Sequence, residues 1–180
     1  MSRAAVFLDR DGVLNAAEVR DGRPYPPASA EDLEILPGVR EACERLAGAG
    51  LALIVVTNQP DVARGTQSAS ELRAIHDRLR AQVRVDEVVV CPHDDADGCL
   101  CRKPRPGMIL DAAARWDVDL SRSVTVGDRW RDVEAGRRAK TRTVFIDRHY
   151  DEPAPEAPDL TVSDLQESIT WILDATKSPN

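Results

Sequence analysis

The chain has 180 residues, of which 42% are hydrophobic and 31% charged, a composition that predicts one folded domain, residues 1–180, with a substantial core. Its net charge of −7 disfavours a general nucleic-acid binder, and it has no apolar run of the roughly 18–20 residues that a membrane span needs. The N-terminal sequence MSRAAVFLDRDG does not resemble a signal peptide, because Asp9, Arg10 and Asp11 interrupt its apolar segment. We therefore expect a cytoplasmic monomer without disulfide bonds that binds neither nucleic acid nor a membrane.

Short apolar runs alternate along the chain with segments of helical periodicity. Five runs are typical of buried parallel strands, and apolar side chains recur at helical spacing after each of them. This alternation predicts an α/β fold, a parallel sheet with helices on both faces. The predicted strands are 4–8, 51–56, 87–91, 123–127 and 143–146. The first three predicted helix faces contain Val39, Cys43 and Leu46; Leu72, Ile75 and Leu79, after an N-cap at Ser68 or Ser70; and Ile109, Leu110, Ala113 and Ala114. The last two contain Val133 and Gly136, and Leu165, Ile169 and Ile172, the latter in the linker and helix 151–176.

Polar residues follow four of the predicted strands directly. In a parallel sheet of this kind, ligands bind beyond the carboxyl ends of the strands, so these residues predict an active site at one edge. Asp132 lies one helical turn after Asp128 and is expected to face the same way, either with an indirect role beside the site or simply as a favourable acid in the first turn of a helix. The four groups are Asp9, Asp11 and Gly12; Thr57, Asn58 and Gln59; the stretch from Cys91 to Lys103; and Gly127 with Asp128.

Asp9 and Asp11 are spaced so that their side chains can project toward one point. A loop with two exposed acids and a turn glycine is the alternative interpretation of this pattern. An aspartate can attack phosphorus, but a carboxylate repels a phosphate dianion and needs a cation beside it. Asp9 and Asp128, with a backbone carbonyl, could bind Mg²⁺. Thr57 and Lys103 could hold the phosphoryl oxygens, while Asp11 could act as general acid and then as general base.

Four segments, in this order along the chain, resemble the motifs of the haloacid dehalogenase-like (HAD) phosphatases: FLDRDGVLN, VVTNQ, CRKP and VGDRWRD. The resemblance implies a HAD-like Rossmannoid fold and Mg²⁺-dependent phosphatase activity through an aspartyl-phosphate intermediate. It implies that Asp9 is the nucleophile, that Asp11 is the general acid and base, and that Thr57 and Lys103 bind the phosphoryl group. The Mg²⁺ ligands that it implies are Asp9, Asp128 and the backbone carbonyl of Asp11.

The stretch CPHDDADGCLCRKP, residues 91–104, contains three of the four cysteines and one of the three histidines. A disulfide is not expected in a reducing compartment. The spacing also fails as a calcium-binding EF-hand loop, because its first position is His93 and its twelfth is Pro104 instead of a glutamate. Three thiolates and one imidazole suit a closed, structural zinc site, with a merely polar loop as the alternative. The predicted zinc ligands, within the loop 91–101, are Cys91, His93, Cys99 and Cys101.

This cysteine stretch and TNQPDVARG resemble, among HAD phosphatases, the zinc-containing subgroup of heptose-bisphosphate and histidinol-phosphate phosphatases. The resemblance is greater to the heptose enzymes, from which Pro60 and Asp61 depart. It implies a phosphorylated sugar as substrate, with release of the 7-phosphate of D-glycero-D-manno-heptose 1,7-bisphosphate. Histidinol phosphate, another small phosphate ester, and a non-catalytic zinc-stabilised binding module are the alternatives. By this resemblance the substrate-binding residues are Glu18, Arg20, Asn58, Gln59, Arg102 and Arg129.

The remaining segments limit how the substrate is selected. Residues 15–36 and 58–86 are expected to hold only loops and one helix, which leaves no room for a large cap domain. Arg102, next to Lys103, could bind a second phosphate group bidentately. His76 is expected on the surface of its helix, and the basic residues 137–142 are typical of a solvated helix end.

Overall fold

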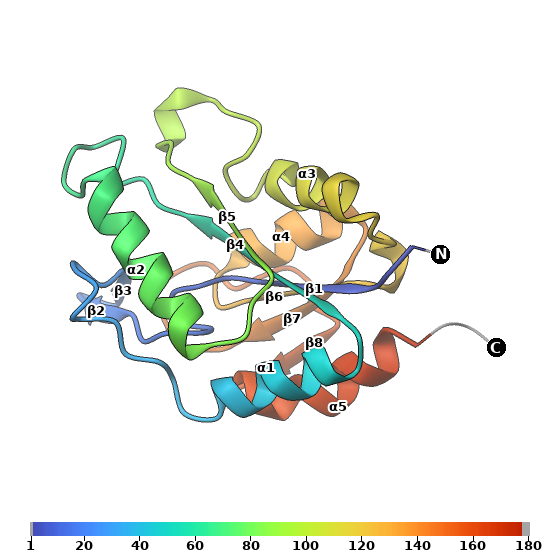
Figure 1. Ribbon diagram of the computed structural model, residues 1–180. Helices are drawn as coiled ribbons and strands as arrows, with labels where there is room; N and C mark the ends of the chain where they lie inside the picture. Colours follow the sequence, from blue (N-terminus) through green and yellow to red (C-terminus); the bar gives the residue numbers. More distant parts are fainter. Residues whose placement is uncertain (1, 178–180) are drawn as a thin grey trace.

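A computed structural model describes residues 2–177, so the predicted domain 1–180 extends beyond the described residues at both ends. The main sheet has six strands, all parallel, in the order β5-β4-β1-β6-β7-β8 (Figure 1). The predicted parallel sheet is therefore confirmed, and all five predicted strands belong to it. The strands are β1 (Ala5–Leu8), β4 (Ala52–Asn58), β5 (Glu87–Cys91), β6 (Val124–Gly127), β7 (Arg142–Ile146) and β8 (Leu160–Val162).

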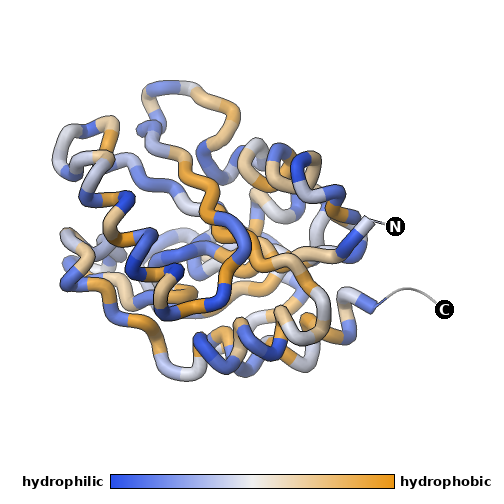
Figure 2. The backbone as a smooth tube through the Cα atoms, in the orientation of Figure 1, coloured by the Kyte–Doolittle hydropathy of each residue, from blue (hydrophilic) through white to orange (hydrophobic). Residues whose placement is uncertain are grey.

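Helices cover both faces of the sheet, as predicted (Figure 1). Successive residues of β1 point to opposite faces, so Val6 and Leu8 belong to one core while Ala5 and Phe7 belong to the other. Figure 2 shows the apolar residues concentrated in the central strands between the two helix layers. No helix in the described part of the chain is long and apolar enough to cross a membrane. The first core also contains α1 (Val39–Gly48), α2 (Ala69–Gln82) and α5 (Leu165–Ala175), and the second contains α3 (Gly107–Trp116) and α4 (Trp130–Ala139).

Local signals in the sequence explain where the helices begin and which side they bury. Ser68 caps α2: its hydroxyl accepts a hydrogen bond from the backbone N–H of Glu71, whose carboxylate accepts one from the backbone N–H of Ser68. The predicted face of α3 was wrong at Leu110 and Ala114, which are exposed. The helix begins at Gly107, directly after Pro106, and this start turns Met108, Ile109, Ala112 and Ala113 toward the core instead.

The periodicity of the sequence did not predict two elements. A hairpin of β2 (Glu18–Arg20) and β3 (Arg23–Tyr25) forms a separate antiparallel sheet, so the prediction of loops alone over residues 15–36 was wrong. Its turn is Asp21-Gly22, and both residues have positive φ, as the tightest hairpin turns require. Strand β8 lies inside the segment expected to be a linker and a helix. No large cap is present over the described residues, in agreement with the sequence analysis.

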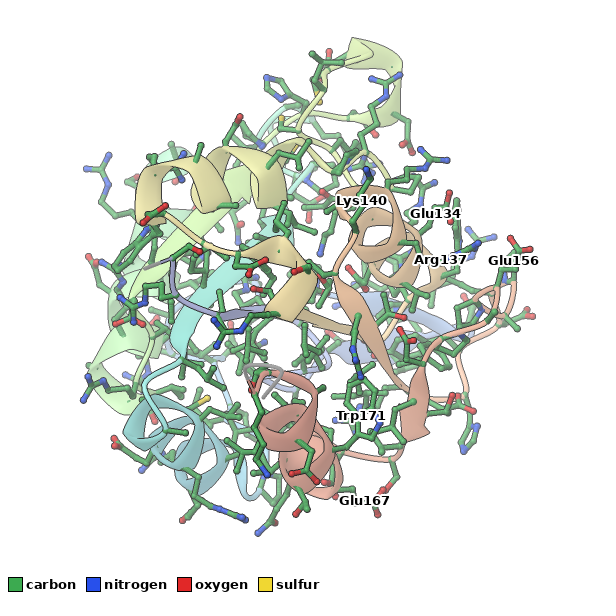
Figure 3. The ribbon with its side chains drawn as sticks, turned by 90° about the vertical axis from the view of Figure 1, so that its right-hand side faces the viewer. Glu134, Arg137, Lys140, Glu156, Glu167 and Trp171 are labelled. Carbon is green, nitrogen blue, oxygen red and sulfur yellow. The ribbon has the colours of Figure 1, made fainter. Side chains whose placement is uncertain are left out.

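Acidic side chains neutralise the basic end of α4. Arg137 forms ion pairs with Glu134 at 3.4 Å and with Glu156 at 3.1 Å, and Arg138 pairs with Glu134 at 2.7 Å. Figure 3 shows Arg137 between Glu134 and the loop that carries Glu156. These pairs agree with the expectation of a solvated helix end.

Candidate active site

The carboxyl ends of the strands form one edge of the sheet, beside the hairpin β2–β3 (Figure 1). Because β1 lies between β4 and β6, Asp9 at the end of β1 lies between Thr57 of β4 and Asp128 after β6. All three side chains are buried, with exposed fractions of 8%, 1% and 3%. They line a cleft of about 500 Å³. Of the predicted site residues, Asp9, Asp11, Thr57, Asn58, Arg102, Lys103, Asp128 and Arg129 line this cleft.

Lys103 is the buried cation of the site. Its Nζ lies 2.8 Å from Oδ1 of Asp9, 2.5 Å from Oδ1 of Asp132 and 2.7 Å from the carbonyl oxygen of Val56. The side chain of Asn58 exchanges two hydrogen bonds of 3.1 Å with the backbone of Lys103, so Asn58 positions the lysine. Burial acts to lower the pKa of Lys103, but Asp132 and Asp9 raise it above its ordinary value, and the ammonium group stays charged.

Asp9, Asp128 and Asp132 bring three buried carboxylates within 4.8 Å of one another. Burial raises the pKa of Asp9 to about 6; Lys103 opposes this effect, while Asp132 and Asp11 add to it. Burial, Asp9 and Asp132 raise the pKa of Asp128 well above its ordinary value. The nearby hydroxyl of Tyr150 and Lys103 oppose this rise in pKa, and no other side chain within residues 2–177 is bonded to the carboxylate of Asp128. Such a group fits a hard cation such as Mg²⁺, whose charge would favour the ionised carboxylates.

Both oxygens of Asp132, in contrast, are bound by the protein. Oδ1 forms an ion pair with Lys103, and Oδ2 accepts a hydrogen bond of 3.0 Å from the backbone N–H of Arg129 at the start of α4. The carboxylate can approach β6 this closely only because residue 127 is glycine: a Cβ there would lie 2.0 Å from the Cβ of Asp132. These contacts favour an indirect role, in which Asp132 holds Lys103 in place.

The carboxylate of Asp11 is fixed by several donors at the mouth of the cleft. It accepts hydrogen bonds from Asn15 at 3.0 Å, from Gln59 at 2.9 Å and from the guanidinium of Arg10 at 2.9–3.1 Å. The same amide nitrogen of Gln59 also donates to the hydroxyl of Thr57 at 2.8 Å. Gln59 was expected to bind substrate, but it is 1% exposed and does not line the cleft. Its side chain orients the predicted acid instead.

The turn after Asp11 brings two distant segments against the site. Gly12 has φ +78°, and a Cβ at this position would lie 1.8 Å from Oδ2 of Asp128 and 2.8 Å from the hydroxyl of Tyr150. Only glycine therefore allows both the turn and the close approach. Arg148, after β7, donates from Nε to the carbonyl oxygen of Gly12 at 2.9 Å and fixes the turn from the other side.

Two of the three arginines predicted to bind substrate, Arg102 and Arg129, line the cleft, and each is paired with an acid. Arg102 lies 2.9 Å from Asp95 and donates to the carbonyl oxygen of His93 at 3.1 Å. Arg129 pairs bidentately with Glu152. Arg23 of β3 also lines the cleft, and it makes no hydrogen bond or ion pair through its side chain within the described part of the chain. It was not singled out in the sequence analysis.

Glu18 and Arg20, which were predicted to bind substrate, do not line the cleft. They lie on β2, are exposed, and pair with each other at 2.5 Å. The hairpin turn sends the chain back along β3, so that Arg23 and Tyr25 form this wall of the cleft. Without the hairpin register, the sequence could not distinguish the strand that faces the cleft from the one that faces away.

The side chains of Cys91, His93, Cys99 and Cys101 form a second cluster, with their ligand atoms within 4.8 Å of one another. The three thiols are free and lie 3.1–3.6 Å apart, close to the roughly 3.7 Å expected between sulfurs around one tetrahedral zinc. Burial raises the pKa of Cys91 and Cys101, whereas the backbone N–H of Arg102 and the neighbouring thiols lower that of Cys99 to about 7 against the effect of burial. The donor set therefore fits a zinc ion.

The sequence analysis missed that two buried residues, Arg10 and His76, belong to the site. Arg10 is completely buried, and His76, expected on the surface of α2, is 9% exposed. The signals were present: residue 10 alternates with Asp9 and Asp11 along an extended chain, and His76 lies three residues before Leu79 on the apolar stripe of α2.

Comparisons with known proteins agree with this geometry. The HAD-hydrolase-like family model matches residues 100–168. The D-glycero-beta-D-manno-heptose-1,7-bisphosphate 7-phosphatase of Rhodopseudomonas palustris is 43% identical over 149 residues, which cover 76% of this chain and 79% of the relative. The enzyme of the same name from Pseudomonas aeruginosa is 40% identical over 166 residues, with coverages of 87% and 90%.

A solved structure gives the same result for the fold. The D,D-heptose 1,7-bisphosphate phosphatase of B. bronchiseptica, complexed with magnesium and phosphate, superposes with a TM-score of 0.81 at 35% identity, covering 95% of this chain and 98% of that one. The predicted HAD-like fold and the predicted phosphatase class are confirmed. The chain therefore belongs to the HAD-like phosphatase family, in the group of the D-glycero-manno-heptose-1,7-bisphosphate 7-phosphatases.

Proposed function

We propose that this chain is a Mg²⁺-dependent phosphomonoesterase that hydrolyses the 7-phosphate of D-glycero-D-manno-heptose 1,7-bisphosphate to give heptose 1-phosphate. The observation that carries the chemistry is the buried Asp9, next to Lys103 and to the buried carboxylate of Asp128. The activity for which the R. palustris and P. aeruginosa relatives are named supports the substrate. The magnesium and phosphate in the B. bronchiseptica structure support the metal.

The first half of the proposed reaction forms an aspartyl phosphate. A carboxylate oxygen of Asp9 attacks phosphorus, and the bond between phosphorus and O7 of the sugar breaks. Asp11 gives its proton to the departing oxygen, so the sugar leaves as a neutral alcohol. Mg²⁺ bound by Asp9, Asp128 and the carbonyl of Asp11 would neutralise negative charge on the phosphoryl group. Lys103 and the hydroxyl of Thr57 hold the phosphoryl oxygens.

The second half restores the enzyme. The carboxylate of Asp11, now deprotonated, takes a proton from a water molecule, whose oxygen attacks the phosphorus of the aspartyl phosphate. The bond between phosphorus and the Asp9 oxygen breaks, and inorganic phosphate leaves. One carboxylate thus serves as acid in the first half and as base in the second, which requires a fixed position rather than a flexible one. The hydrogen bonds from Asn15, Gln59 and Arg10 supply that position.

The retained 1-phosphate needs cations away from the reacting centre, and the arginines of the cleft supply them. Arg102 and Arg129 would exchange their carboxylate partners for phosphate oxygens, which an arginine can bind bidentately. Arg23 is available without such an exchange. Asp61, which could favour an ammonium group, lies 3.6 Å from Arg64, whose shorter contacts are with Asp94 at 2.6 and 3.0 Å. The preference for a bisphosphate over histidinol phosphate therefore rests on the arginines of the cleft.

We expect kcat/KM to be higher for heptose 1,7-bisphosphate than for histidinol phosphate, with phosphate released from position 7. The Arg102→Ala variant should lose about 10–100-fold in kcat/KM for the bisphosphate, because a buried anion without its partner costs about 1–3 kcal/mol. Its activity on p-nitrophenyl phosphate, which has no second anion, should change much less. The measurement is phosphate release from both anomers of the bisphosphate, with ³¹P NMR to identify the phosphate that stays on the sugar.

Two results would contradict this assignment. Higher efficiency on histidinol phosphate would move the enzyme to the alternative substrate class, and release of the 1-phosphate would reverse the orientation of the sugar. Absence of any magnesium-dependent phosphate release would instead favour the non-catalytic alternative.

We also propose that the cysteine cluster binds one structural zinc ion. Its four protein ligands leave no open coordination position, so this metal would not take part in catalysis. The guanidinium of Arg102 is bound to the carbonyl of His93 and to Asp95 in the same loop, so an ordered loop orders this arginine as well.

Mild EDTA treatment is expected to abolish activity, which Mg²⁺ should restore, while about one zinc per chain persists. The Cys99→Ser variant should lose zinc and unfold roughly 5–15 °C lower, with impaired activity. Elemental analysis and thermal unfolding are the measurements. Cys43→Ala is the matched control, because Cys43 is buried in the core away from the cluster and its loss should leave the zinc content unchanged. Zinc-free protein from a chelator-free purification would refute the site.

The proposed enzyme acts as a monomer in the cytoplasm, without nucleic-acid or membrane partners. Four free cysteines support a reducing compartment, and the net charge of −7 supports the absence of a nucleic-acid partner. Sedimentation of the purified protein would test the monomeric state.

A further inference from the structure

A buried arginine and a buried histidine lie beneath the predicted acid of the site. The guanidinium of Arg10 has no exposed surface, which is rare for a charged group unless a partner of opposite charge is buried with it. Its Nε and Nη2 donate to the carboxylate of Asp11 at 2.9–3.1 Å. Its Nη1 lies 2.9 Å from Nε2 of His76, which comes from α2, 66 residues further along the chain.

The chemistry of this contact determines the state of His76. A guanidinium group has only donors, so the short contact with Nη1 requires a lone pair on Nε2. The imidazole must then be neutral, with its proton on Nδ1. Burial and the charge of Arg10 agree with this state, because they lower the pKa of His76 to about 4. His76 is therefore an acceptor of fixed direction across the physiological pH range.

The orientation of the Arg10 guanidinium matters because this group holds the carboxylate of Asp11. Asn15 and Gln59 each give one hydrogen bond to Asp11, one on each oxygen, whereas Arg10 contacts both oxygens. Among residues 2–177, His76 is the one other side chain that bonds to the guanidinium. A change at His76 would leave Nη1 without an acceptor and allow the guanidinium, and with it Asp11, to turn.

We infer that His76 is a positioning residue for the general acid and base: through Arg10 it directs the carboxylate of Asp11 toward the leaving oxygen. This inference rests on the proposed role of Asp11. His76 touches neither the substrate cleft nor a predicted metal ligand, so its effect must pass through Arg10. If His76 only filled space in the core, its replacement would affect folding, and it would slow all steps of the reaction to a similar extent.

Leaving groups of different basicity separate these two roles. A sugar alkoxide needs a proton from Asp11 to depart, whereas p-nitrophenolate does not. In His76→Ala we expect kcat on heptose 1,7-bisphosphate to fall about 10–100-fold, with KM within about threefold of the wild-type value. The first turnover of p-nitrophenyl phosphate should stay within about threefold of wild type. Later turnovers should be slow, because removal of the aspartyl phosphate still needs the base, so a burst of nitrophenol should appear.

His76→Gln is the conservative variant, since its side-chain carbonyl can accept from Arg10, and it should recover most of the lost kcat. Equal losses on both substrates without a burst, or a His76→Gln variant as slow as His76→Ala, would overturn the inference. Asp11→Asn serves as the reference, because it should show the same selectivity and burst. If Asp11→Asn shows neither, the proposed role of Asp11 fails first, and a failure confined to the His76 variants overturns only the present inference.

A measurement on the unaltered protein covers the case in which His76→Ala does not fold. In ¹⁵N-histidine-labelled protein at pH 7, His76 should give the signals of a neutral ring protonated at Nδ1. The spectrum of His76→Gln identifies these signals among those of His93 and His149. A proton on Nε2 of His76 would exclude the contact with Arg10 and refute the inference.

Discussion

Replacing Asp9 by asparagine is expected to abolish phosphate release, with kcat reduced by at least about a thousandfold, in a protein that still folds. An amide cannot form the acyl phosphate, and it is a poorer ligand for Mg²⁺ than a carboxylate. Because Asp9 is buried beside Asp128 and Asp132, the substitution also removes one of three neighbouring negative charges. Without magnesium, the variant should therefore unfold at the same temperature as wild type or above it.

The measurement is phosphate release with and without Mg²⁺, together with thermal unfolding and circular dichroism. Asp111→Asn, on the exposed side of α3, is the matched control and should behave as wild type. Activity of Asp9→Asn within about tenfold of wild type would remove Asp9 from the mechanism.

Lys103→Met is expected to lower activity, and to lower stability more than any other single change at this edge of the sheet. Lys103 is 3% exposed and lies between Asp9 and Asp132, so its loss leaves buried carboxylates without a counter-charge. Removing one partner from such a buried pair costs about 3–5 kcal/mol of unfolding free energy. The phosphoryl group would also lose its fixed positive charge, and kcat should fall about a hundredfold or more.

The stability loss of Lys103→Met should depend on pH. Asp9 has a pKa of about 6 in the folded wild type against 3.8 as the ordinary value, and Lys103 acts to lower it, so without Lys103 the folded state takes up the proton at a still higher pH. Protonation removes the repulsion, and folding is favoured on the acid side. The metal-free variant should therefore be closer to wild type at pH 5 than at pH 8. Chemical denaturation at both values, with exposed Lys177→Met as the control, provides the measurement; a pH-independent deficit would contradict the electrostatic explanation.

The sequence predicted the framework of the site because that framework depends on local periodicity. Short apolar runs specified the strands, and parallel strands necessarily bring their carboxyl ends to one edge. No further information was needed to predict that this edge carries Asp9, Thr57, Lys103 and Asp128. The hairpin β2–β3 lacked such a signal: each strand has three residues and no buried face, so only the Asp21-Gly22 turn pointed to it.

The direction of individual polar side chains could not be predicted in the same way. Asn58 ends strand β4 at the cleft and Gln59 follows it, but their partners lie elsewhere in the sequence, 45 residues away at Lys103 and 48 residues away at Asp11. Glu152, the partner of Arg129, follows another strand. Such pairs depend on the tertiary arrangement of loops, which leaves no periodic trace in the sequence. His76 was wrongly expected on a surface because a histidine is compatible with either side of a helix.

The hairpin β2–β3 lines the cleft through Arg23 and Tyr25 but lies outside the main sheet. It forms its own two-stranded sheet, paired with none of the other described strands, and its side chains are largely exposed. The proposed catalytic acids instead follow strands that lie between the two cores, and Lys103 is buried beside them. Mutations in the hairpin can therefore accumulate with little cost to folding. Divergence of this short surface segment would change one wall of the cleft while the residues of the proposed reaction stay the same.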